Sequence, residues 1–233
     1  MLLSSQDHER IRLAVKAAEL TTRGEIVCVV AKEASHYKEV PLAWAAIGAL
    51  GLPLLVLILA VGVGAAGFDD ALGGWRAAQV AAGHALVISV LVGYALLQGV
   101  LFIVIALLVS MPIARRALTP RRLKRVQVHR RALEQFVAHD LHNAHDHTGV
   151  LIYASLDERV AEVIADAGIN DKVGPRAWDE VIEVLIARMR AGRPGDGFIE
   201  AIEKCGHLLS THFPADGSHH HELSDDILEA PVL

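Results

Sequence analysis

The stretch "GVLIYASLDERVAEVIAD", residues 149–166, decides the fold of this chain of 233 residues. Its first eight residues are almost all apolar, which predicts a strand that is buried on both faces. Asp157 and Glu158 predict a turn, and residues 159–166 predict a partner strand after it. The stretch therefore indicates a β-sheet in the interior of a domain.

Another strand is predicted much earlier, at "GEIVCVVA", residues 24–31. A single strand leaves its backbone N–H and C=O groups unpaired, so it is not expected to fold alone. We therefore expect residues 25–31 to pair with residues 149–155 in one sheet. The remaining patterns predict helices and so an α/β domain; they cover residues 4–22, capped by Ser4 or Ser5, residues 120–145, capped by Thr119, residues 175–189 and residues 196–214.

Two long apolar segments, residues 42–66 and 85–109, lie between the two strands and contain no charged side chain. Each is longer than the roughly 20 residues that a helix needs to cross a bilayer. The first is also too long for the apolar region of a signal peptide, which has roughly 7 to 15 residues. We expect a hairpin of two transmembrane helices; the alternative is a buried helix pair in a soluble protein.

Arginine and lysine predict the orientation of this hairpin. The connector 67–84 holds only Arg76, whereas residues 112–131 hold eight basic side chains. Because basic loops stay in the cytoplasm, both termini are expected there, on the inner face of a bacterial plasma membrane. The basic cluster is expected to meet anionic lipid headgroups, and the net charge of −5 argues against a nucleic-acid-binding protein.

The sequence thus divides into four parts. Residues 1–41 and 112–214 are expected to form one α/β domain, residues 42–111 the membrane hairpin, and residues 215–233 a polar, disordered tail. Within the hairpin, the lone Gln98 is expected to hydrogen-bond to the neighbouring helix. Two cysteines, Cys28 and Cys205, lack CxxC spacing and are expected to pack in the core.

Residues 148–214 resemble the TPM-domain family, which includes thylakoid lumen and photosystem-repair proteins and is often labelled phosphatase-like. It looks most like the bacterial membrane branch, with a hairpin inserted in the domain, and it extends over residues 119–214 and more weakly over residues 1–41. The resemblance implies a small α/β/α sandwich and a shallow acidic pocket, which binds calcium in some relatives. It is carried by Thr148 to Ile152, Ser155-Leu156, Glu162 to Asp166, Gly168-Ile169, Trp178, Gly197-Phe198 and His212-Phe213-Pro214.

Two groups of side chains are candidate metal ligands. Glu162, Asp166 and Asp171 supply oxygen ligands that suit Ca²⁺ or Mg²⁺, and the resemblance favours Asp166. His142 and His145, three residues apart, could form part of a second site together with His139. The alternatives are solvated carboxylates and a polar helix end, because histidines near a helix C-terminus complement the helix dipole.

No complete set of catalytic residues is present in the sequence. An aspartyl nucleophile would need a metal and a second acid or base, and the sequence identifies neither. We therefore expect an inner-membrane protein whose α/β domain binds a protein partner or a second copy of itself, with possible divalent-cation binding. The alternative is a metal-assisted phosphatase.

Overall fold

The computed structural model describes residues 2–35, 37, 39–62, 92–111, 114, 117–141, 148–216 and 226–230. The chain divides into two compact units. One is an α/β unit made of Met1–His36 and Pro120–Leu233, and the other is the apolar unit Tyr37–Thr119. The first and last parts of the chain thus lie in one compact unit.

The α/β unit is built on a four-stranded sheet of order β3-β2-β1-β4. β1 and β2 are parallel and in register from the pair Glu25–Gly149 to the pair Ala31–Ser155, which confirms the predicted pairing. β3 follows β2 as an antiparallel neighbour, and β4 adds to the other edge of β1 in parallel. The strands are β1 (Glu25–Ala31), β2 (Gly149–Ser155), β3 (Val160–Ala165) and β4 (Leu228–Ala230).

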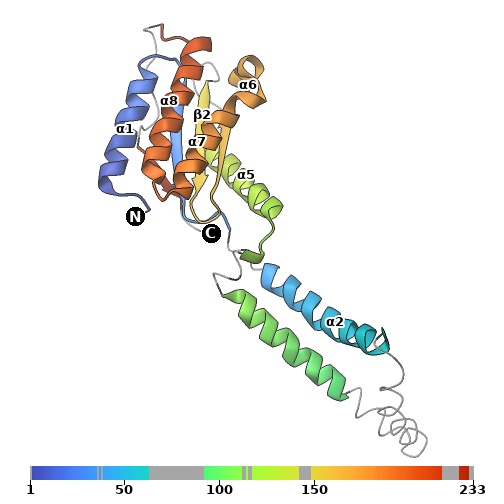
Figure 1. Cartoon of the computed structure of the whole chain (residues 1–233). Coiled ribbons are helices and arrows are strands. Elements are labelled where there is room, and N and C mark those ends of the chain that lie inside the picture. The colour runs from blue at the N-terminus through green and yellow to red at the C-terminus, as the bar shows by residue number, and fades with distance from the viewer. Residues whose placement is uncertain are drawn as a thin grey trace, which may run out of the picture. The chain divides into compact units, whose positions relative to one another are not determined.

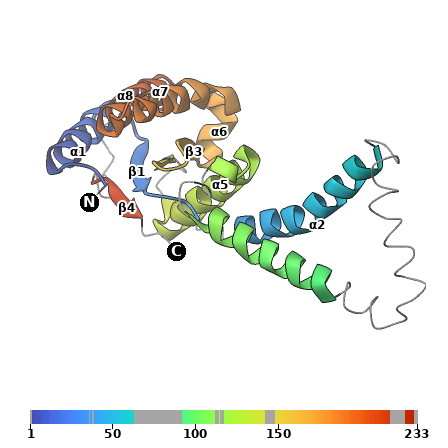
Figure 2. The same ribbon diagram turned by 60° about the horizontal axis from the view of Figure 1, so that its bottom comes forward.

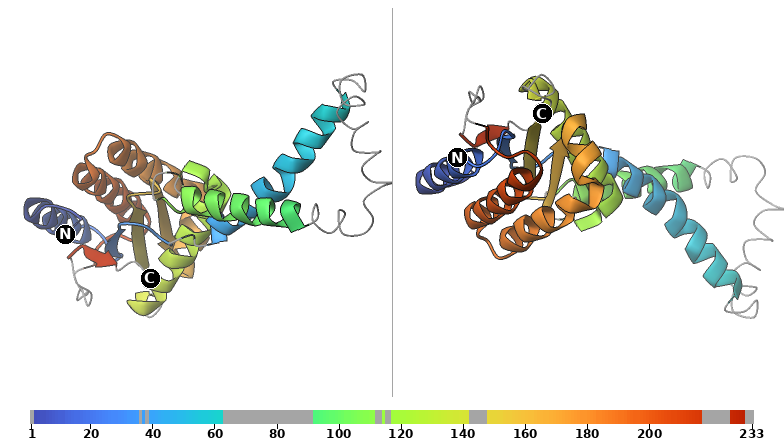
Figure 3. Two further views of the ribbon diagram at one scale, coloured as in Figure 1. Left: turned by 90° about the horizontal axis from the view of Figure 1, so that it is seen from below. Right: turned by 90° about the horizontal axis from the view of Figure 1, so that it is seen from above.

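Helices cover both faces of this sheet, as Figure 2 shows from one end and Figure 3 from above and below. Because side chains alternate along a strand, Ile26, Cys28 and Val30 of β1 face one helical layer. Val27 and Val29 face the other. Every residue of β1 and of β2 is buried, as the apolar run predicted. The fold is thus a mixed α/β sandwich.

The thicker layer is seen in front of the sheet in Figure 1. Its large buried side chains include Ile11 and Val15 from α1, Leu185 from α7 and Phe198 and Ile202 from α8. The short segments α6 and η3 connect β3 to α7. The layer comprises α1 (Ser5–Glu19), α6 (Ala167–Val173), the 3₁₀ helix η3 (Pro175–Trp178), α7 (Asp179–Arg190) and α8 (Pro194–His212).

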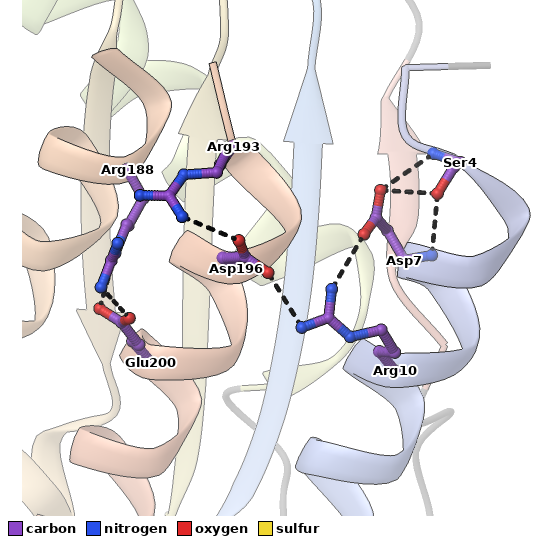
Figure 4. A network of polar contacts seen from close by, with 7 residues as sticks. All are labelled: Ser4, Asp7, Arg10, Arg188, Arg193, Asp196 and Glu200. Atoms are coloured by element: carbon purple, nitrogen blue, oxygen red, sulfur yellow. Dashed lines mark hydrogen bonds and ion pairs between the residues drawn. The ribbon is translucent and has the colours of Figure 1, made fainter. Parts of the chain in front are cut away.

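A polar network joins α1 to the start of α8 (Figure 4). Ser4 caps α1 and forms a reciprocal capping box with Asp7. Arg10 contacts Asp7 at 3.4 Å and Asp196 at 2.9 Å. Gly195 is required here because a Cβ atom at this position would lie 2.5 Å from Oδ1 of Asp7. The sequence "GRPGDG", residues 192–197, therefore connects the end of α7 to the start of α8 and lets α8 pack closely against α1.

The other face of the sheet carries α5 (Arg121–Ala138), which buries Val128, Ala132 and Phe136. This helix is shorter than predicted at both ends. Pro120 is its N-cap and no side chain caps it, so the expectation for Thr119 was wrong. It ends at Ala138 because the chain turns at Asp140, whose φ is 54°, in the left-handed region.

The expectation of a disordered tail is wrong for residues 228–230. They form β4, in which Leu228, Glu229 and Ala230 lie beside Val29, Val30 and Ala31 of β1. Glu229 also accepts a hydrogen bond from the backbone N–H of Leu2, at 2.7 Å. Residues 228–230 therefore form an edge strand of the sheet.

The second unit contains α2 (Glu39–Gly62) and the helix Val92–Ser110. Among the described residues, only Val92–Ser110 is long and apolar enough to cross a membrane; the apolar segment Glu39–Leu55 of α2 is shorter. The two helices touch, since Gln98 Nε2 donates to the carbonyl of Ala49 at 3.3 Å, as predicted. A Cβ at Gly48 would lie 2.5 Å from Cδ1 of Ile105, so this glycine permits close approach.

Candidate functional site

Glu158, in the turn after β2, holds two loops together. The Glu158 carboxylate accepts the backbone N–H of Ala34, at 3.0 Å, and the hydroxyl of the fully buried Ser155. It thus ties the loop after β1 to the turn after β2. A serine that is buried and bonded in this way is not placed to attack a substrate.

The three predicted oxygen ligands lie at different places along β3 and α6. Glu162 is on β3, and its carboxylate lies 2.9 Å from Nδ1 of His129 on α5. Asp166 is the N-cap of α6 and accepts the N–H of Ala167 at 2.6 Å. Asp171 lies one turn further along α6. Glu162 lies on the same face of β3 as Val160 and Ile164, which pack on the α5 side, whereas Ile169 of α6 packs in the opposite layer.

The described residues contain no group of three or more His, Cys, Asp or Glu side chains that could hold a metal ion. Of the predicted imidazole ligands, His139 is the C-cap of α5, and its ring nitrogen lies 3.2 Å from the side-chain oxygen of Gln135. His142 and His145 lie outside the described residues. Binding of Ca²⁺ or Mg²⁺ by these residues remains a prediction.

A groove of about 560 Å³ lies along η3, α7 and α8, and we call it the α7–α8 groove. Its apolar lining comes from Ala177 and Val181 on one side and Leu208 on the other. It forms because α7 and α8 pack as an antiparallel pair, joined by a tight turn in which Gly192 has a φ of 74°. The polar lining consists of Arg176, Glu180, Glu203, Lys204, His207, Thr211 and His212.

Polar side chains of the α7–α8 groove bond to one another or to the backbone. Lys204 Nζ lies 3.1 Å from a carboxylate oxygen of Glu180, an exposed pair that links the two helices. The Thr211 hydroxyl donates to the backbone carbonyl of His207 at 2.9 Å, so no base activates it. The groove thus combines an apolar lining with charged side chains of both signs.

Neither cysteine offers a reactive thiol. Burial, with Cys205 and Glu19 nearby, raises the pKa of Cys28 well above its ordinary value. Burial likewise raises the pKa of Cys205 to about 12. Because the thiolate is the nucleophile, both residues serve as core side chains, as expected from the sequence.

Sequence reasoning did not find the α7–α8 groove. Its walls come from residues about 30 positions apart, and each wall alone has the pattern of an ordinary amphipathic helix. The one available signal was the run of polar side chains Glu203, Lys204 and His207 beside a buried stripe on α8.

Comparison with known proteins agrees with this architecture. Residues 114–208 match the family model of the TPM domain. The fold is similar to the NMR structure of the BA42 protein from the psychrophilic bacterium Bizionia argentinensis, with a TM-score of 0.55 and 18% identity. That likeness covers 98% of this chain and 95% of BA42. No curated protein matches the sequence. The predicted resemblance is thereby confirmed for this part of the chain: residues 114–208 match the TPM domain.

Proposed function

We propose that this chain is an integral protein of the bacterial inner membrane, in which a two-helix hairpin anchors a cytoplasmic TPM domain. The domain binds a protein partner, or a second copy of the chain, at the α7–α8 groove. The observation that carries the membrane assignment is the exposed apolar surface of the helix Val92–Ser110.

Only 6% of the apolar window of this helix is buried. Leu96, Leu97, Ile103 and Leu107 are each more than half exposed. A core helix of a soluble protein would bury such side chains, at about 25 cal/mol for each Å² of apolar area removed from water. A contiguous apolar surface that is left uncovered is expected to face lipid.

The sheet supports two crossings rather than one. β1 and β2 pair along their whole length, yet the apolar segments lie between them in the sequence. The chain must therefore cross the membrane an even number of times between Ala31 and Gly149. If Val92–Ser110 crosses, α2 crosses as well, and its 24 residues span about 36 Å at 1.5 Å per residue.

The basic residues between 112 and 131 support a cytoplasmic domain, because basic loops stay inside by the positive-inside rule. Reporter fusions test this directly. A reporter that is active only outside the cell should work when fused within the connector 67–84 and should fail at the C-terminus, and a cytoplasmic fluorescent reporter should give the opposite pattern. A C-terminus on the outer side, or release of the chain by alkaline carbonate, would overturn the membrane assignment.

Partner binding is tested by a photo-crosslinking side chain at Thr211, in the α7–α8 groove, in native membranes. We expect a discrete crosslinked product that is lost in Glu203→Lys, because this change reverses a charge at the groove. The matched control is Glu183→Lys, an exposed position of α7 outside the groove lining. If both variants keep the product, the partner is not bound at this groove.

The alternative is a metal-assisted phosphatase. It is favoured by the name of the matching family model, TPM phosphatase, and by the carboxylates of β3 and α6. The detergent-solubilised chain is assayed with a generic phosphate ester with and without Ca²⁺ or Mg²⁺. Asp166→Asn is the informative variant, since asparagine keeps the helix cap and removes the charge. Metal-dependent activity that disappears in this variant would favour the enzyme, and no activity with any metal would dismiss it.

A further inference from the structure

The outer face of α5 carries an exposed apolar stripe that no described residue covers. Val126, Leu133 and Val137 are 62%, 47% and 54% exposed. Their spacings of seven and four place them on one face of the helix. This face is opposite to Val128, Ala132 and Phe136, which pack on the sheet.

Cations gather in the N-terminal turn of α5, where Arg122 lies one turn before Val126 on the same face and Arg121 and Arg125 lie beside it. Arg121, Arg122 and Arg125 are exposed, and none forms an ion pair with another residue in the described part of the chain. The first turn of α5 contains no acidic side chain. Because the positive end of a helix dipole disfavours cations, this clustering has a cost that an external anion would offset. Further along, Arg130 is already paired with Glu134, at 3.0 Å.

The connection to the apolar helix limits where α5 can lie. Ten residues, 111–120, separate Ser110 from Arg121. Even fully extended they span at most about 36 Å, so the cations of α5 stay within reach of the headgroup region. An amphipathic helix with exposed apolar side chains and flanking cations has the composition of an interfacial membrane helix.

We propose that the outer face of α5 lies on the membrane surface and binds anionic lipid headgroups through Arg121, Arg122 and Arg125, while Val126, Leu133 and Val137 enter the headgroup boundary. This inference rests on the proposed membrane insertion. It assigns the α5 face of the sandwich to lipid, and it leaves the α7–α8 groove, in the opposite layer, open to a protein partner.

The test uses the full chain in nanodiscs of zwitterionic lipid, with or without about a third of anionic lipid, an amount chosen to create a negative surface potential. An environment-sensitive fluorophore is attached to Val126→Cys, and in a control to Leu13→Cys, which is 53% exposed on α1. Cys28 and Cys205 are buried and do not compete for the label. We expect a blue shift at position 126 in anionic discs, and several-fold stronger quenching by a lipid-attached quencher than at position 13.

The triple change Arg121→Gln, Arg122→Gln and Arg125→Gln should abolish the difference in blue shift between the two lipid compositions. Neutralising the exposed Lys16, Arg190 and Arg193 instead, all outside the α7–α8 groove, should leave that difference intact, although the net charge changes equally. If the probe at position 126 stays in water although the chain resists carbonate extraction, this inference is overturned. The proposed membrane insertion is then still supported. A probe at position 126 that is equally shielded from water in both lipids, and is not quenched by the lipid-attached quencher, must contact protein. That result also overturns the inference.

Discussion

Arg10 and Asp196 form an ion pair across 2.9 Å, between a helix that precedes the apolar unit and a helix that follows it. Their side chains are 46% and 32% exposed. We therefore expect a double-mutant cycle of Arg10→Ala and Asp196→Ala to give a coupling free energy below about 1 kcal/mol in chemical denaturation.

Burial, rather than this pair, is expected to hold α1 in place. Ile11→Ala should lower the free energy of unfolding by about 2 to 5 kcal/mol, because Ile11 is fully buried. The matched control Leu13→Ala, at an exposed position, should cost far less. A coupling free energy larger than the Ile11→Ala effect would show that electrostatics dominates this contact.

Gly195→Ala is predicted to destabilise the domain by about 1 to 2 kcal/mol, since the new methyl group would push Asp7 out of its capping box. Thermal unfolding measures the effect. In a Ser4→Ala background, where the capping box is already broken, the same change should cost clearly less. If Gly195→Ala destabilises the domain equally in the two backgrounds, the change does not act through the capping box.

Tyr153 is predicted to make stability decline at alkaline pH. Burial, reinforced by the Glu158 carboxylate, raises the pKa of Tyr153 to about 12. An unfolded tyrosine has a pKa of about 10. Between these values the folded chain binds more protons than the unfolded chain, so stability is full below pH 10 and falls as the pH rises to about 12.

Denaturation curves at several pH values, compared between the natural chain and Tyr153→Phe, measure this decline. In the variant, the free energy of unfolding should fall less steeply at alkaline pH. The titration of phenolate absorbance should lack its last step. An unchanged slope in Tyr153→Phe would mean that this phenol is not protected in the folded state.

Both thiols are predicted to resist a maleimide reagent at neutral pH, because their raised pKa values and complete burial suppress the thiolate. Labelling should become rapid in denaturant. Leu13→Cys provides an exposed thiol in the same chain as a positive control. Rapid labelling of the folded natural chain would show that the core around Cys28 opens readily.

The sheet could be predicted because its signals are local. β2 is a run of apolar residues, and β1 needed a partner for its backbone groups. β4 could not be predicted, since Leu228, Glu229 and Ala230 follow a polar segment and become a strand only through the edge of β1. The end of α5 was misplaced because Leu141 continues the apolar pattern, although the chain has already turned at Asp140.

The candidate site was harder to predict than the fold. Asp166 was identified from the sequence, but its carboxylate caps α6, a short helix that the sequence analysis missed. The α7–α8 groove depends on how two helices pack, and no motif within either helix records that packing.

The parallel pairing of β1 with β2 sets the order of events during synthesis. When Ala31 leaves the ribosome, its partner strand has not yet been translated, and at about 5 to 20 residues per second the wait lasts about 6 to 24 seconds. During that delay both apolar segments are synthesised while the first strand remains unpaired. Completion of the sheet is therefore a late event, and a chaperone that shields the nascent amino-terminal segment would raise the yield of the folded domain.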